Sequence, residues 1–176
     1  EFLGALEDSG CTTAETGWLA QHVIIRDAVT KIVGVMPLYL KSHSYGEYVF
    51  DHAWANAYQN AGGKYYPKLQ SAVPFTPVTG PRIAAHPESD CDKVRQEIIR
   101  AAISLAQERG VSSLHVTFAE KDEWQILADK GFLKRQDQQF HWVNQNYGNF
   151  DDFLSDLSSR KRKNIRKERR AALSLD

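Results

Sequence analysis

The segment between Asp51 and Arg82 is dense in side chains that could hold a polar substrate. Its aromatic rings offer flat surfaces with a polar edge, and its lysine and arginine can bind an anionic group. The same composition also fits a purely structural role, in which the rings pack in the core and the charged groups face water. The candidate substrate-binding residues are Trp54, Tyr58, Tyr65, Tyr66, Lys68 and Arg82.

Two further residues are candidates for moving a proton during catalysis. His141 lies in an aromatic stretch, and imidazole changes its charge near neutral pH. A half-buried histidine with a structural hydrogen bond would give the same pattern. Asp51 is the carboxylate candidate, although neighbours on a strand point to opposite faces, so a direct contact with His52 is not expected. We expect the loop over 51–82 to meet the strand that carries His141, because binding clefts form at strand ends.

Several kinds of catalytic centre have no signature in the sequence. The six histidines show neither an HExxH motif nor a close pair with a third ligand, so no metal site is expected. The sequence also lacks a Gly-x-Ser-x-Gly elbow, a Walker loop and a GxGxxG motif. No tightly bound cofactor is therefore expected. Cys11 and Cys91 lie far apart, and two reduced thiols are typical of a cytoplasmic protein.

The charge is distributed unevenly along the chain. Residues 1–159 hold 14 Lys/Arg and 20 Asp/Glu, whereas residues 160–176 hold 8 Lys/Arg and 2 Asp/Glu. A solvated helix is one interpretation of the basic segment, because its only apolar side chain from 160 to 170 is Ile165. The other is contact with phosphates, of a tRNA-borne donor, a nucleotide-linked precursor or an anionic membrane surface. The candidate phosphate-binding residues are Arg162, Lys163 and Arg166.

The apolar periodicity predicts a mixed α/β fold, in which an antiparallel hairpin is followed by strand, helix, strand, helix and strand. The later strands should form a largely parallel patch. The longest apolar run, near 32–40, is far shorter than the ~20 residues of a membrane-spanning helix. We expect helices over 2–8, 53–61, 90–109, 121–131 and 150–157, and strands over 18–26, 32–40, 47–50, 79–84, 113–118 and 133–147.

This order of elements resembles the acyl-CoA N-acyltransferase superfamily, with Leu127–Phe132 standing where its Lys/Leu-Gly-Phe turn would be. Most of the chain is similar to the FemAB-like family of predicted N-acyltransferases. Three segments carry that resemblance: Gly46–Trp54, Gln139–Trp142 and Ser158–Arg170. Fem-type proteins carry two such folds. The resemblance therefore implies a fragment of a longer chain, in which residues 1–159 form the first N-acyltransferase-like domain and residues 160–176 begin the second.

The resemblance implies an acyl- or aminoacyl-transferase that acts on an amine acceptor, in peptidoglycan or cell-envelope biosynthesis. Acyl-CoA and aminoacyl-tRNA are the candidate donors, the acceptor would be a small molecule or a cell-envelope precursor, and a tRNA could contact the basic segment. The turn over 84–92 departs from the superfamily, because it has no glycine and carries Glu88, Asp90 and Asp92, which would repel a diphosphate. The alternative is a non-catalytic domain that recognises a glycan, peptide or nucleic acid. The sequence leaves the oligomeric state open.

Overall fold

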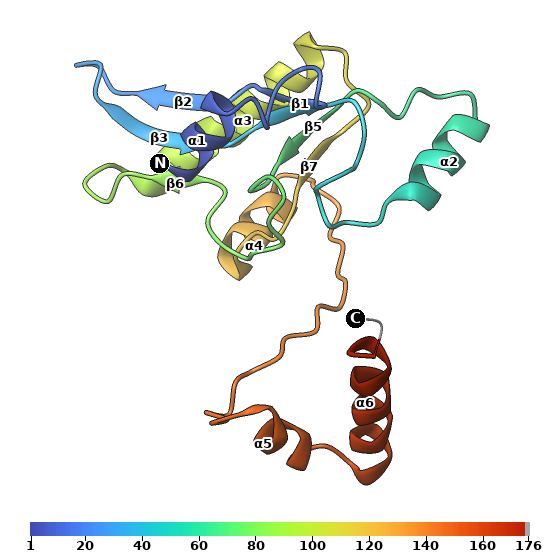
Figure 1. The fold of residues 1–176 in the computed structure, drawn as a ribbon. Helices are drawn as coiled ribbons and strands as arrows, with labels where there is room; N and C mark the ends of the chain where they lie inside the picture. The colour runs from blue at the N-terminus through green and yellow to red at the C-terminus, as the bar shows by residue number, and fades with distance from the viewer. Residues whose placement is uncertain (175–176) are drawn as a thin grey trace. The chain divides into compact units, whose positions relative to one another are not determined.

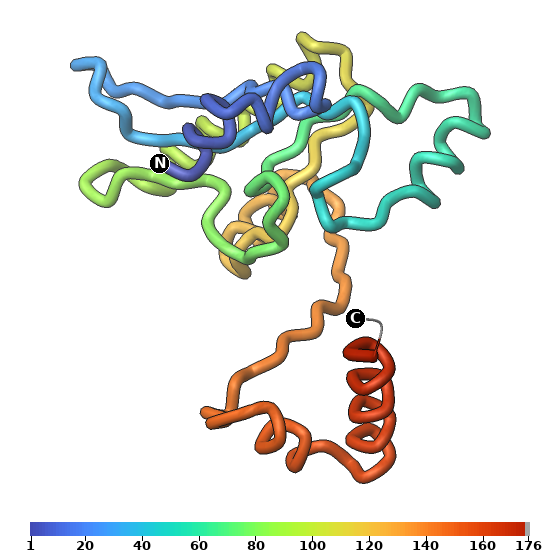
Figure 2. Tube along the Cα trace, in the orientation of Figure 1, coloured from blue at the N-terminus to red at the C-terminus, as the bar shows by residue number. Residues whose placement is uncertain are grey.

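The structure is a computed structural model that describes residues 1–174, and its chain divides into two compact units. Unit 1 covers residues 1–134 and unit 2 covers residues 135–176 (Figures 1 and 2). Within the described residues, all strands belong to unit 1. None of the helices within residues 1–174 is long and apolar enough to cross a membrane.

Unit 1 contains two sheets. The first has the strand order β1 (Trp18–Ala20), β4 (Tyr39–Lys41), β5 (Lys68–Ser71) and β7 (Leu114–Val116). The second has the order β2 (Val23–Arg26), β3 (Ile32–Met36) and β6 (Ala84–Ala85). Only the β5–β7 pair is parallel, and every other pair is antiparallel. The mixed α/β class is therefore confirmed. The parallel patch expected among the later strands is wrong, because β6 pairs antiparallel with β3 in the second sheet, and β7 pairs parallel with β5, a segment predicted as loop.

The main hydrophobic core of unit 1 forms around α3 (Cys91–Glu108), which contacts strands of both sheets. Asp90 caps this helix by accepting a hydrogen bond from the Lys93 N–H at 3.1 Å; the sequence offers Ser89 and Asp90 equally for this role. On β3, Gly34 allows the helix to come close, because a Cβ there would lie 2.4 Å from a methyl carbon of Val94. The buried core residues are Val23, Met36, Leu38, Leu69, Ile83, Val94, Ile98, Ile99, Ala102 and Leu127.

The other helices of unit 1 are α1 (Phe2–Asp8), α2 (His52–Asn60) and α4 (Lys121–Asp129), each close to its predicted range. In Figure 1, α2 lies at one end of the first sheet, away from α3. Only Ala55 of α2 is buried, so most of this helix is exposed to solvent.

Several predicted strands are wrong in extent. The strands expected over 18–26 and 32–40 each divide into two short strands, and Pro37, which has no N–H to donate, lies at the second break. No strand forms over 47–50, and the strand expected over 79–84 is reduced to β6. Within the described part of the chain, residues 133–147 also form no strand.

Unit 2 contains α5 (Phe150–Ser155) and the basic helix α6 (Ser159–Ala172). Asn149 caps α5 by accepting hydrogen bonds from two backbone N–H groups, and Arg166 of α6 lies 3.3 Å from the carboxylate of Asp151. The boundary expected after residue 159, with a second domain beginning at residue 160, stays a prediction.

Candidate functional site

The first sheet has one apolar face and one polar, aromatic face. Tyr39 pairs with Gln70 and Lys41 pairs with Lys68 across β4 and β5, so these side chains share one face of the sheet. Leu69 points to the opposite face and joins the core around α3. The polar face is fully buried at these four positions, although it carries two lysines. Such a face needs partners that its own strands do not provide.

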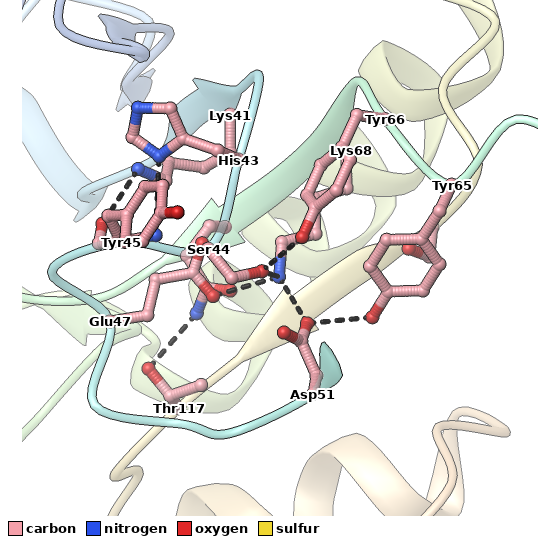
Figure 3. Close-up of polar contacts among 12 residues, drawn as sticks. Lys41, His43, Ser44, Tyr45, Glu47, Asp51, Tyr65, Tyr66, Lys68 and Thr117 are labelled. Carbon is pink, nitrogen blue, oxygen red and sulfur yellow. Dashed lines mark hydrogen bonds and ion pairs between the residues drawn. The ribbon is translucent and has the colours of Figure 1, made fainter. Parts of the chain in front are cut away.

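Lys68 is the centre of the polar cluster on this face. Its side chain has no exposed surface, and its ammonium donates three hydrogen bonds. The acceptors are Ser44 Oγ at 2.9 Å, Glu47 Oε2 at 2.8 Å and Asp51 Oδ2 at 2.7 Å. All three come from residues 42–51, which follow β4, and they surround the ammonium in Figure 3. A lysine ammonium has three donors, so the bonding capacity of Lys68 is filled.

Asp51 lies at the N-terminus of α2, but its carboxylate makes no capping hydrogen bond. Asp51 Oδ2 instead accepts hydrogen bonds from Lys68 and from the Tyr65 hydroxyl, the latter at 2.7 Å. Burial acts to raise the pKa of Asp51, but hydrogen bonds from Lys68, Ser44 and Tyr65 outweigh it and lower the pKa to about 2. Asp51 is therefore a carboxylate anion at neutral pH.

Glu47 is the second buried carboxylate, and its environment acts in the opposite direction. Burial raises the pKa of Glu47, and the neighbouring Lys68 only partly offsets that effect. A carboxylate with a raised pKa is a better proton acceptor than an ordinary one. The cluster thus pairs one strongly acidic carboxyl group, Asp51, with one more basic carboxylate, Glu47.

Lys41 has fewer partners than Lys68. Its Nζ lies 3.4 Å from the ring centroid of Trp18 and donates one hydrogen bond, at 3.3 Å, to the carbonyl of Tyr45. Burial lowers the pKa of Lys41 to about 7, with a further lowering from the charge of Lys68 and an opposing effect from Glu47. A lysine with this pKa exchanges its proton near neutral pH.

Several buried polar atoms of this cluster have no hydrogen-bond partner among the described residues. They are Glu47 Oε1, Asp51 Oδ1, Gln70 Oε1, Tyr39 OH and Trp18 Nε1. Buried polar groups in folded proteins are normally paired with protein groups, ordered water or a ligand, so each of these atoms can form one more hydrogen bond, to a water or to a ligand. Three of the five are acceptor oxygens of a carboxylate or an amide. A ligand with several N–H donors, such as a primary ammonium group, would satisfy them.

A model of the FemAB-like family, described as peptidoglycan biosynthesis/recognition, matches residues 1–176. The chain belongs to the FemAB-like family. No curated protein and no solved structure matches it. The family confirms the FemAB-like resemblance and indicates a role in peptidoglycan biosynthesis or recognition, whereas membership of the wider N-acyltransferase superfamily stays a prediction.

Four of the residues predicted for the site of this FemAB-like chain come together in the polar cluster. Asp51, Tyr65 and Lys68 are in direct contact, and Tyr66 OH lies 2.8 Å from Ser44 Oγ, which in turn contacts Lys68. Trp54 lies on α2 with an exposed ring, outside the cluster, and Tyr58 lies on the same helix with a half-exposed ring that contacts Tyr65.

Arg82 lies elsewhere in the FemAB-like chain, in a network of its own. Its guanidinium donates to backbone carbonyls of Val78, Gly80, Pro81 and Thr117, at 2.6–3.3 Å. The Glu123 carboxylate accepts the backbone N–H groups of Arg82 and Ile83. Arg82 thus ties the loop before β6 to β7 and α4, and its binding of a substrate anion stays a prediction.

The remaining predicted residues lie in unit 2. His141 is exposed, lies outside any strand and has Nε2 at 2.7 Å from Gln139 Oε1. Arg162 donates to the carbonyl of Leu157, Lys163 is exposed, and Arg166 pairs with Asp151. The roles of His141 in catalysis and of the basic residues in phosphate binding stay predictions. Residues 1–174 contain no group of three or more His, Cys, Asp or Glu side chains that could hold a metal ion.

Sequence reasoning missed six members of the cluster: Trp18, Tyr39, Lys41, Ser44, Glu47 and Gln70. Lys41 follows the apolar run over 32–40 directly, and a charge at the end of such a run was an available signal. No such signal marks Gln70, because β5 has only one apolar residue and follows Pro67, a composition that is typical of a loop.

Proposed function

We propose that this FemAB-like chain takes part in the transfer of an acyl or aminoacyl group to a primary amine of a peptidoglycan precursor. The observation that carries the proposal is the pair of buried carboxylates, Glu47 and Asp51, each with one oxygen on Lys68 and one without a partner. The family supports the cell-envelope substrate, since its description names peptidoglycan biosynthesis or recognition.

In the proposed reaction the ammonium group of the acceptor donates hydrogen bonds to Asp51 Oδ1 and Glu47 Oε1. Asp51, with its pKa of about 2, holds the cation, and Glu47, with its raised pKa, accepts one proton from it. The neutral amine then attacks the carbonyl carbon of the activated donor, so that a C–N bond forms and the C–S or C–O bond to the leaving group breaks. The leaving thiol or hydroxyl takes the proton that the attacking nitrogen loses, and Glu47 releases its proton to solvent. The chain contributes mainly by positioning the amine.

Residues 42–51 cover the two carboxylates, which are almost completely buried. The acceptor can therefore reach them only if this segment moves, as loops that cover active sites commonly do. The charge of Lys68 holds Glu47 and Asp51 in place while the segment is closed.

The test is a transfer assay with a labelled acyl-CoA or aminoacyl-tRNA and a peptidoglycan precursor that carries a free primary amine. We expect an amide product with the free amine and none after the acceptor amine has been acetylated, because an acetamide can neither bind as a cation nor attack. Product formation that is indifferent to acetylation would contradict the proposal.

A second candidate function, recognition of peptidoglycan without chemistry, is favoured by the N-terminus of α3. The Asp90 carboxylate already accepts a hydrogen bond from the backbone N–H of Lys93, and Glu88 and Asp92 add negative charge nearby. A diphosphate of coenzyme A would meet repulsion at this place. Binding of the precursor without any transfer from either donor, in the same assay, would support recognition and exclude the first function for this chain.

A further inference from the structure

Residues 45–63 expose aromatic side chains and bury acidic ones. The carboxylates of Glu47 and Asp51 turn inward to Lys68. Five large rings of the same segment are 46–74% exposed: Tyr45, Tyr48, Phe50, Trp54 and Tyr58. We call these five residues the aromatic surface. Trp54 and Tyr58 lie four residues apart on α2, so their side chains are neighbours on one face of the helix. Neighbouring exposed rings are typical of a binding site, whereas single exposed apolar residues are common.

The exposed part of this segment also lacks charged side chains. Apart from the two buried carboxylates, residues 45–63 contain no Asp, Glu, Lys or Arg. Helix α2 itself, with the sequence HAWANAYQN, has no such residue, although eight of its nine residues are exposed. Its polar side chains besides His52 are the amides of Asn56, Gln59 and Asn60. Solvated helices are normally rich in charged residues, so hydration alone does not explain this composition.

The aromatic surface has local structural support. Ala55 anchors α2, and the Tyr58 ring lies edge-on to the ring of Tyr65, with 6.2 Å between centroids. The backbone of Gly63 passes directly beneath Tyr58, because a Cβ at residue 63 would lie 2.3 Å from Tyr58 Cε1. Glycine at this position therefore allows the ring to adopt its orientation. A ring held in this way loses little side-chain entropy when it binds a ligand.

We propose that residues 45–63 bind a neutral saccharide chain, with the sugar rings stacked on Trp54 and Tyr58. A sugar ring has a flat face of C–H groups that packs on an aromatic ring, and hydroxyl and acetamido groups that pair with amides. The surface offers both kinds of partner and no charge. Anionic membranes and nucleic acids are bound through Lys and Arg, which this surface lacks.

The aromatic surface begins where the buried cluster ends. Asp51 is the N-cap residue of α2, and its carboxylate accepts a hydrogen bond from the Tyr65 hydroxyl. The Tyr65 ring in turn contacts the Tyr58 ring. A saccharide on α2 would thus lie on the element that starts at the proposed amine site, and Figures 1 and 2 show α2 following directly from that loop. This inference deepens the proposed function by naming the saccharide part of the acceptor, and it rests on that function only for the acceptor's identity.

The test measures binding without any acyl donor, so that its outcome is separate from that of the transfer assay. The whole chain is titrated by calorimetry with two N-acetylglucosamine oligomers of different length, both of which are neutral. We expect binding of at least one probe, and a Kd raised about tenfold by Trp54→Ala and by Tyr58→Ala. Gly63→Ala should also weaken binding, because the added methyl group displaces the Tyr58 ring.

Phe2→Ala is the matched control, since Phe2 is an exposed aromatic residue of α1 and should leave the Kd unchanged. The melting temperature of each variant shows whether it folds. Trp54→Ala should leave it unchanged because the Trp54 ring is exposed, whereas Tyr58→Ala should lower it slightly because the Tyr58 ring packs on Tyr65. Failure of the native chain to bind either probe would overturn the inference. So would equal losses in Phe2→Ala, or Trp54-dependent binding to phosphatidylcholine vesicles or to a second copy of the chain in place of the saccharide.

Discussion

Lys41 and Lys68 are direct partners across β4 and β5, and neither has exposed surface. Like charges at such a pair repel each other, yet Glu47 and Asp51 both bond to Lys68. Lys41 has only one carbonyl and the Trp18 ring as partners. The two lysines therefore differ in their surroundings: Lys68 is paired with two carboxylates, whereas burial lowers the pKa of Lys41 to about 7.

Removal of the Lys68 charge is expected to destabilise unit 1 strongly. Lys68→Met keeps the length of the side chain but leaves two buried carboxylates without their counter-ion, which costs about 3–5 kcal/mol of unfolding free energy. Urea unfolding measures the loss. Lys64→Met, at an exposed lysine four residues earlier, should change the free energy by less than about 0.5 kcal/mol. A similar small change in both variants would show that the cluster does not form.

Lys41 should make the stability depend on pH in the alkaline range. Its pKa is about 7 in the folded chain and near the ordinary 10.5 when unfolded, so the unfolded chain binds more protons between these values. The free energy of unfolding should therefore rise from pH 7 to about 9.5, below the range in which tyrosines titrate. Lys41→Met should remove the rise, while Lys31→Met, at an exposed lysine, should keep it. An unchanged slope in Lys41→Met would contradict the lowered pKa.

Arg82 is expected to matter for folding. Arg82→Ala removes a buried side chain and its hydrogen bonds to the partly buried carbonyls of Val78, Gly80, Pro81 and Thr117, and should cost about 2–3 kcal/mol. The melting temperature is measured for this variant and for the control Arg109→Ala, which changes an exposed arginine directly after α3 and should leave the melting temperature nearly unchanged. If Arg82→Ala has the melting temperature of the native chain but a lower affinity for the substrate, the prediction that Arg82 binds substrate is right and its structural role is wrong.

Coenzyme A is expected to bind the chain weakly. Glu88, Asp90 and Asp92 surround the N-terminus of α3, and each like-charge contact with a phosphate is unfavourable by roughly 1 kcal/mol at an exposed site. Calorimetry should show no binding in the micromolar range. Micromolar affinity in the native chain would mean that the donor binds as it does in the wider superfamily.

The sequence predicts elements well where one periodic pattern decides them. The helix capped by Asp90 and ended at Gly110 has apolar residues at helical spacing, and its limits were predicted almost correctly. The strand β5 was missed because its residues face two buried environments, a polar one for Lys68 and Gln70 and an apolar one for Leu69. Its burial comes from neighbouring strands and from residues 42–51, which no local pattern describes.

The same reason limits the prediction of the site. Asp51, Tyr65, Tyr66 and Lys68 were chosen for their chemistry, and the structure brings them together. Glu47 is not among the predicted site residues, because a glutamate at the start of the strand expected over 47–50 normally faces water. Only the position of Lys68 beneath the loop makes Glu47 a buried carboxylate.

The central claim is that Glu47 and Asp51 receive the acceptor amine, and the transfer rate of Glu47→Gln tests it most directly. With a donor that the native chain accepts, we predict a fall in kcat of at least about a hundredfold, since the amide cannot take the proton. The rate should recover in part as the pH is raised and the acceptor amine loses its proton to solvent. Glu108→Gln, at an exposed glutamate of α3, should leave the rate unchanged. A Glu47→Gln variant that folds and transfers at the native rate at every pH would contradict the claim.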